Sequence, residues 1–173
     1  MEDHDDEIYG IDRDKAHQRA RDLVSDEFFW DCGDELAPFG SDEGDTALAE
    51  FRQWRRKNPK APVLDCLKWT IEGVGEMDFA DYNDALVNEE VILKQIEDAN
   101  FNDQQYIFTL DVSVMATGFG QLVDEGKIDP NAKPVIQRAI KRQWLWAGLR
   151  TDWPFSAEYR SKLDVLERVL QQA

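Results

Sequence analysis

The sequence contains only two cysteines and two histidines among its 173 residues. Cys32 and Cys66 lie far apart, and no C-x-x-C or H-E-x-x-H motif occurs, so a zinc site is not expected. The N-terminus, MEDHDDEIYG, is acidic where a secretory signal would be basic and then apolar. We therefore predict a cytoplasmic protein in which both thiols stay reduced.

Long apolar runs are also missing, because none approaches the roughly 18 residues of a membrane span. There is no G-x-S-x-G elbow and no phosphate-binding loop. Gly118-x-Gly120 begins like a dinucleotide-binding fingerprint, but Val123 replaces the third glycine and no strand is expected before it. The sequence therefore predicts no cofactor and no membrane association, and it contains no motif that identifies an enzyme.

Basic residues are scarce in the first 50 positions, where 17 Asp and Glu stand against four Lys and Arg. Residues 51–173 carry 19 acidic and 16 basic side chains, and the whole chain has a net charge of −16. Nucleic acid is not an expected ligand, because binding it requires Lys and Arg to neutralise phosphates. An acidic surplus keeps a protein soluble, and it can also steer a cationic partner toward the surface.

Apolar residues make up 42% of the chain and aromatic residues 11%, which is enough for a globular core. The length fits one domain. Apolar residues recur at intervals of three to four positions, the spacing of a helix with one buried face. We predict an all-α fold, a single compact domain of about seven helices over residues 8–173 with two long aromatic-rich loops. Residues 1–7 are predicted to be a flexible acidic tail.

Capping and stop signals place the expected helices at 12–25, 45–58, 62–73, 88–99, 103–125, 129–144 and 156–173. Asp12, Asp45, Asn88, Asp129 and Ser156 are the expected N-caps, and Gly126 is an expected stop. Pro134 leaves the start of the helix after Asp129 open by a few residues. Segment 106–114 is also rich in strand-forming residues, so an edge strand is the competing prediction there.

The chain is organised around residues 28–59, in which two aromatic clusters bracket an acidic loop and a helix then begins. Acidic residues precede this helix and basic residues end it, which matches the helix dipole at both ends. A well-capped helix accounts for these residue choices without any further function.

Our first functional hypothesis is a non-enzymatic interaction module that binds a basic protein partner. The acidic loop supplies charge, and aromatic residues beside it are candidate anchors because Trp dominates interface hot spots. The candidate partner-binding residues are Asp34, Glu35, Asp42, Glu43, Asp45, Trp30 and Phe39. The alternative is a metal-dependent hydrolase that uses His17 as a base with the Asp34–Asp45 carboxylates. The spacing of these carboxylates does not demand a metal ion, and no metal or catalytic residue is predicted in the first hypothesis.

Four segments carry a resemblance to a known family: IYGIDRDKAHQRARDL, DEFFWDCGDELAPFGSDEGDTAL, FRQWR and ATGFGQLVDEGKIDP. Together they resemble the uncharacterised bacterial YfeS-like family over residues 8–143. The resemblance implies a small soluble bacterial protein and transfers no activity to any residue. The shorter run FGSDEGDTAL is similar to small acidic proteins encoded beside bacterial toxins, which adds an immunity-like role to the first hypothesis.

Overall fold

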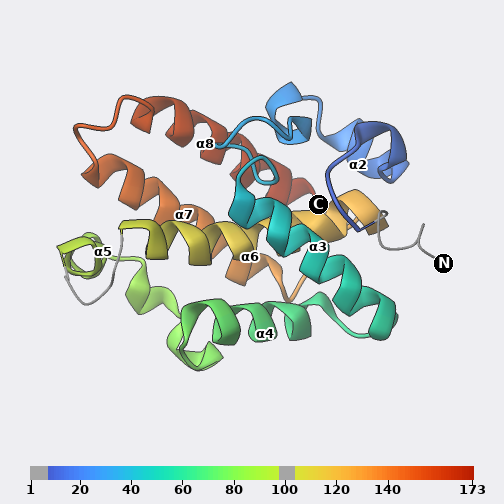
Figure 1. The fold of residues 1–173 in the computed structure, drawn as a ribbon, viewed down its shortest axis with the longest axis horizontal. Coiled ribbons are helices and arrows are strands. Elements are labelled where there is room, and N and C mark those ends of the chain that lie inside the picture. Colours follow the sequence, from blue (N-terminus) through green and yellow to red (C-terminus); the bar gives the residue numbers. More distant parts are fainter. Residues whose placement is uncertain (1–7, 98–103) are drawn as a thin grey trace.

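The computed structural model describes residues 8–97 and 104–173, and within these ranges the chain is all helical, with no strand. The described residues form seven α-helices: α2 (Gln18–Leu23), α3 (Asp42–Lys57), α4 (Val63–Gly75), α5 (Glu89–Glu97), α6 (Gln104–Glu125), α7 (Lys133–Leu149) and α8 (Ser156–Gln172) (Figure 1). The prediction of a single all-α domain is confirmed. The predicted acidic tail over residues 1–7 lies outside the described residues. None of the described helices is long and apolar enough to cross a membrane.

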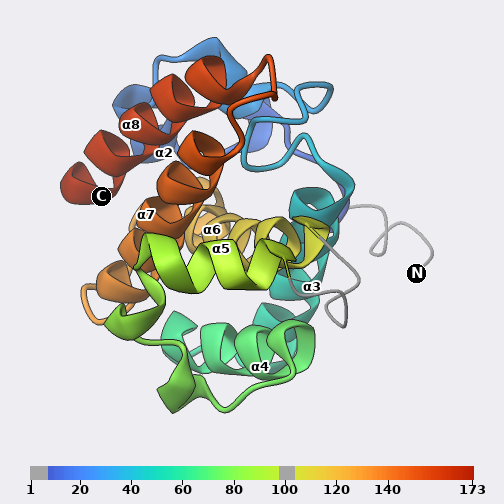
Figure 2. The same cartoon turned by 90° about the vertical axis from the view of Figure 1, so that its left-hand side faces the viewer.

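Helix α6 runs through the centre of the molecule, with α3, α4 and α7 packed around it and α8 along α7 (Figures 1 and 2). Every residue at positions 110–123 is buried, so this helix has no solvent-facing side over that length. A strand at 106–114 was expected because residues such as Val and Ile favour strands. A helix that is buried on all sides also requires apolar residues such as Val and Ile. The strand alternative is therefore wrong.

Close helix contacts explain a glycine inside α6. A Cβ atom at Gly118 would lie only 2.2 Å from Cδ1 of Ile136, on α7. Glycine is unfavourable inside a helix, so its presence here is explained by the close approach of α7 to the backbone of α6.

The first predicted helix, 12–25, is in fact divided into a 3-10 turn at Arg13–Lys15 and the short helix α2. Asp12 caps the turn as predicted, since its carboxylate accepts a hydrogen bond from the Asp14 amide. The break occurs because the His17 amide donates to the Val123 carbonyl of α6 (2.8 Å) and so cannot continue the turn before it. Nδ1 of His17 then caps α2 by accepting from the Arg19 amide (3.1 Å).

Helix α3 begins at Asp42, three residues before the expected start, and its N-cap is Ser41 rather than Asp45. Oγ of Ser41 accepts a hydrogen bond from the Gly44 amide (3.1 Å). A side chain at Gly44 would place its Cβ 2.0 Å from the carbonyl oxygen of Pro38, so the preceding loop folds against this glycine. The prediction of Asp45 as the cap is wrong, whereas the acidic first turn and basic last turn of the helix are confirmed.

Helix α7 begins at Lys133 rather than at Asp129. Asp129 instead serves α4, because its carboxylate accepts a hydrogen bond from the amide of Val63, the first residue of that helix (2.9 Å). Partial burial of Asp129 favours its neutral form, but the bond from Val63 and the charge of Lys127 outweigh burial and lower its pKa. A capping residue that lies 66 positions away cannot be found from local sequence.

The second aromatic loop is shorter than predicted, since α7 continues past Trp144 to Leu149 and leaves only residues 150–155 as a loop. Ser156, the expected cap of the last helix, is the first residue of α8, and its hydroxyl donates to the Ala147 carbonyl near the end of α7. This bond ties the start of α8 to α7, which brings Trp146 and Trp153 together, with ring centroids 5.6 Å apart.

Candidate binding site, an acidic and aromatic pocket

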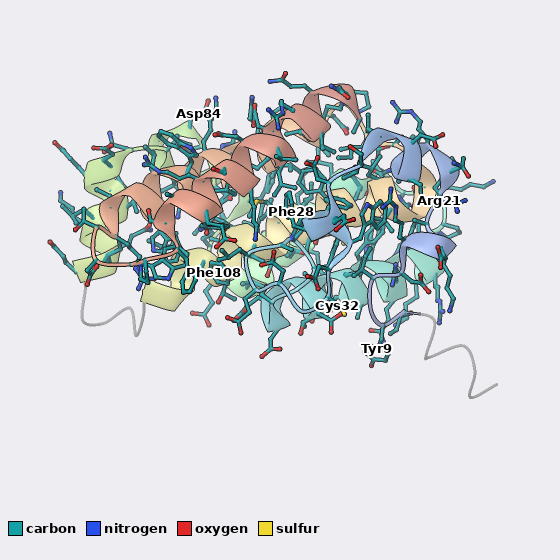
Figure 3. All side chains as sticks on the ribbon, turned by 90° about the horizontal axis from the view of Figure 1, so that it is seen from above. Tyr9, Arg21, Phe28, Cys32, Asp84 and Phe108 are labelled. Carbon is teal, nitrogen blue, oxygen red and sulfur yellow. The ribbon has the colours of Figure 1, made fainter. Side chains whose placement is uncertain are left out.

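A pocket of about 370 Å³ lies where the loop before α3 meets the end of α7. One side of it is acidic and comes from that loop and the first turn of α3. The other side is aromatic and comes from α6, α7 and the loop 150–155, with Phe108 marking the α6 wall in Figure 3. The acidic side is lined by Glu35, Asp42 and Glu43, and the other side by Phe108, Trp146, Trp153 and Arg150.

The aromatic side of the pocket is a packed cluster centred on Trp146. Its ring lies 5.7 Å from Phe108, 5.6 Å from Trp153 and 6.3 Å from Tyr159, between ring centroids. Trp146 is only 3% exposed, and its indole N–H has no hydrogen-bond acceptor among the described residues. Trp146 meets Tyr159 edge to face and the other two rings at tilted angles, and together with Phe108 and Trp153 it forms the aromatic wall of the pocket.

A cation already lies against this wall. The guanidinium carbon of Arg150 is 4.9 Å from the centroid of Trp146 and 5.2 Å from that of Trp153. Both distances fall within the roughly 6 Å range of cation–π attraction. In the part of the chain that the structure describes, the guanidinium makes no hydrogen bond and no ion pair, so it is held by the two rings.

The acidic side carries carboxylates that are not neutralised by a neighbour. Glu35 and Asp42 are exposed and Glu43 is half-buried. Within residues 8–97 and 104–173 none of the three forms an ion pair, even with Arg150, which lines the same pocket. Asp42 and Glu43 lie in the first turn of α3, where the helix dipole stabilises negative charge. The pocket thus combines uncompensated negative charge with aromatic surface.

The other predicted site residues lie elsewhere and have other contacts. Asp34 pairs with Lys162 of α8 (2.5 Å) and so holds the loop to that helix. Partial burial favours the neutral form of Lys162, but the hydrogen bond to Asp34 outweighs it and raises the pKa of the lysine. Asp45 lies within the first turn of α3 and does not line the pocket.

The two predicted aromatic anchors also lie outside the pocket. Phe39 is 1% exposed and packs edge-on against Phe29, with centroids 5.5 Å apart, so it belongs to the core. Trp30 is half-buried, and its indole N–H donates to the Val24 carbonyl (3.0 Å). The aromatic residues that do line the pocket come from positions 108, 146 and 153.

The hydrolase alternative receives no support from the position of His17. Its ring is exposed beside Gly126, where it caps α2, and no hydrogen bond or ion pair joins it to the predicted carboxylates in the described ranges. Among the described residues, no three His, Cys, Asp or Glu side chains come together as a metal site.

A second polar cluster, which was not predicted from the sequence, is buried between α6, α7 and α8. Asp111 is 0% exposed, and its carboxylate accepts hydrogen bonds from Arg142 (3.0 Å), Tyr82 (2.7 Å) and Gln143 (3.0 Å). Tyr159 completes the cluster by donating to the side-chain oxygen of Gln143 (2.7 Å). Burial raises the pKa of the Asp111 carboxyl, and the charge of Arg142 opposes that effect.

This buried cluster also holds the chain between α4 and α5. Arg142 donates to the Leu86 carbonyl (2.8 Å) and to the Gln95 side chain (3.3 Å). Arg138, one turn earlier on α7, donates to the Tyr82 carbonyl and to Asp84, which is labelled in Figure 3. Because its members are buried and bonded to one another, we assign the cluster a structural role. An aspartate inside the apolar run 107–116 is the sequence signal that could have indicated it.

Comparison with known proteins finds a relative in Escherichia coli (strain K12), the "Uncharacterized protein YfeS". The two sequences are 31% identical over 143 residues, which is 83% of this chain and 56% of the relative. The chain thus spans little more than half the length of that protein. No protein-family model and no solved structure matches. The match confirms the resemblance noted in the sequence, because over these 143 residues the chain is similar to this YfeS protein.

Proposed function

We propose that this chain is a non-enzymatic interaction protein that binds a basic polypeptide through the acidic and aromatic pocket. The observation that carries the proposal is that three carboxylates, which form no ion pair with any described residue, lie beside an aromatic wall that already holds a guanidinium. Partner-binding surfaces commonly combine such aromatic anchors with charge that complements the partner.

The charge distribution supports the same proposal. The first 50 residues hold 17 acidic and four basic side chains, more negative charge than the caps of two or three helices can use. Like charges on one domain repel and lower stability, so an uncompensated surplus suggests a role outside folding. A surface of this kind accelerates association with a cationic partner by roughly 10 to 1,000-fold.

The biological setting is part of the proposal. Cys32 is exposed and Cys66 is buried, both are free thiols, and we place the protein in the cytoplasm, where thiols stay reduced. A toxin or another basic factor would be a partner of the required charge.

The proposal is tested by measuring the association rate of a fluorescent basic peptide as a function of salt. The rate should fall several-fold between about 0.01 and 0.15 M salt, where the screening length shrinks from about 30 to 8 Å. The triple variant Glu35→Gln, Asp42→Asn and Glu43→Gln should slow association much more than it speeds dissociation.

A matched control removes the same charge from another part of the acidic region. Asp14→Asn, Asp26→Asn and Glu27→Gln alter three exposed residues that do not line the pocket. If this control slows association as much as the pocket variant does, the acidic segment acts only as a diffuse solubilising face and the proposed site is wrong.

A further inference from the structure

We infer that the pocket recognises an arginine side chain of the partner, and that Arg150 fills the same aromatic slot until the partner displaces it. This inference rests on the proposed function, since it names the group by which a basic partner would be recognised. It specifies the chemical group that the pocket binds, and it identifies Arg150 as an internal competitor for that group.

The slot suits a guanidinium better than an ammonium ion. Arg150 places its guanidinium within 4.9 and 5.2 Å of two indole centroids, from Trp146 and Trp153. A planar, weakly hydrated guanidinium stacks on aromatic faces, whereas the ammonium of lysine is compact and strongly hydrated. The protein therefore already contains a complex of this slot with an arginine side chain.

Arg150 is nevertheless an incompletely bonded occupant. A guanidinium carries five N–H donors, and those of Arg150 have no acceptor among the described residues. By contrast, Arg142 on the same helix donates to a carboxylate, a carbonyl and an amide oxygen. An arginine that entered the pocket from outside and also reached Glu35, Asp42 or Glu43 would add charge-assisted hydrogen bonds that Arg150 lacks.

The position of Arg150 allows this exchange. It is the C-cap residue of α7, at the start of the loop 150–155, and no helix hydrogen bond depends on its side chain. The side chain can therefore leave the slot without unfolding α7. Displacement is also required, since two guanidinium ions in one slot repel each other.

The experiment uses the intact chain and two capped peptides that differ only in having arginine or lysine at the same positions between glycines. Dissociation constants are measured by isothermal titration calorimetry at low salt, with tryptophan fluorescence as a second readout. The arginine peptide should bind more tightly than the lysine peptide. Arg150→Gln should tighten binding of the arginine peptide several-fold, because it removes the internal competitor.

Arg160→Gln is the matched control. Arg160 also lies over a tryptophan, 3.6 Å from the centroid of Trp144, but it does not line the pocket. The control removes the same charge and should leave the dissociation constant unchanged. Trp153→Leu should weaken binding of the arginine peptide about five-fold or more. The unfolding transition of each variant shows whether it is folded. If Trp153→Leu does not fold, Arg150→Gln alone tests the inference.

The possible outcomes separate this inference from the proposed function. If both peptides bind equally and only the carboxylate variants matter, the inference is overturned while the acidic docking surface stands. If Arg150→Gln weakens or abolishes binding of the arginine peptide, Arg150 supports the site instead of competing for it, and the inference is again overturned. If neither peptide binds at low salt, the proposed function and the inference both fail.

Discussion

Arg142 and Arg150 lie eight residues apart along α7 and its C-cap, yet the regions around them differ in almost every respect. Arg142 is 1% exposed and bonds to Asp111, to the Leu86 carbonyl and to Gln95. Arg150 is half-buried against two rings, beside carboxylates that do not pair with it. Around Arg142 the polar groups are hydrogen-bonded to one another. Around Arg150 the carboxylates remain available to a binding partner.

This difference indicates which charged side chains affect the stability of the fold and which affect binding. Moving a charge out of water costs several kcal/mol, so a buried ion persists only when hydrogen bonds surround it. Exposed charges remain hydrated and contribute little to the stability of the fold. We therefore expect substitutions around Arg142 to change stability, and substitutions around Arg150 to change binding.

The largest effect is expected from breaking the buried pair. Arg142→Met leaves the Asp111 carboxylate without its counter-charge in the core, and should lower the free energy of unfolding by about 3–5 kcal/mol. Urea denaturation followed by circular dichroism measures this change. Combining it with Asp111→Leu should lose less than the sum of the two single variants, because no isolated charge then remains. A loss below about 1 kcal/mol for Arg142→Met would show that this cluster does not hold the fold.

A smaller effect is expected at the rim of the pocket, where structural and binding roles meet. Ser41→Ala removes the cap of α3 and should cost about 1 kcal/mol of unfolding free energy. Asp45→Ala should cost less, about 0.3–1 kcal/mol, because Asp45 lies in the first turn of α3, where its charge interacts with the helix dipole. If thermal or urea unfolding showed a larger loss of unfolding free energy for Asp45→Ala than for Ser41→Ala, Asp45 would be the cap of α3 after all.

Asp129 is an intermediate case, a partly buried carboxylate that accepts a hydrogen bond from the Val63 amide and forms an ion pair with Lys127 (3.6 Å). Because its pKa is lowered on folding, the carboxylate stabilises the fold above its unfolded pKa, about 3.9. That stabilisation is lost as the pH falls through the folded pKa. Asp129→Asn should therefore flatten the fall in unfolding free energy below about pH 4, while the fall persists in Asp45→Asn. Parallel acid-unfolding curves for wild type and Asp129→Asn would contradict this.

The sequence predicts the fold well because most of the signals for it are local. The spacing of apolar residues identified the helices, and Asn88 does cap α5 by accepting from the Glu90 amide (2.8 Å). Gly126 ends α6 with a φ of 78°, as expected of a C-terminal glycine. The wrong boundaries are those set by distant partners, such as the His17 amide bound to Val123.

The pocket could be predicted only in part, for a related reason. Charge counting identified the acidic segment that supplies Glu35, Asp42 and Glu43. The aromatic wall comes from positions 108, 146 and 153, and periodicity shows which face of a helix is apolar but not which loop meets that face. Phe39 was a reasonable anchor by residue type, but it packs into the core because its loop folds against α3.

The smallest effect is expected when the substitution made at Arg142 is repeated at Arg150. This pair of variants tests the comparison most directly. Arg150→Met removes a cation that two rings hold at 4.9 and 5.2 Å, an interaction worth about 0.5–1 kcal/mol at a surface. Met retains apolar contact with the rings, so the loss of unfolding free energy should stay below about 1 kcal/mol. Arg142→Met, measured in the same urea series, provides the reference. If the two variants lose similar stability, Arg150 is a structural residue whose departure disrupts the end of α7, and the slot is not available to a partner.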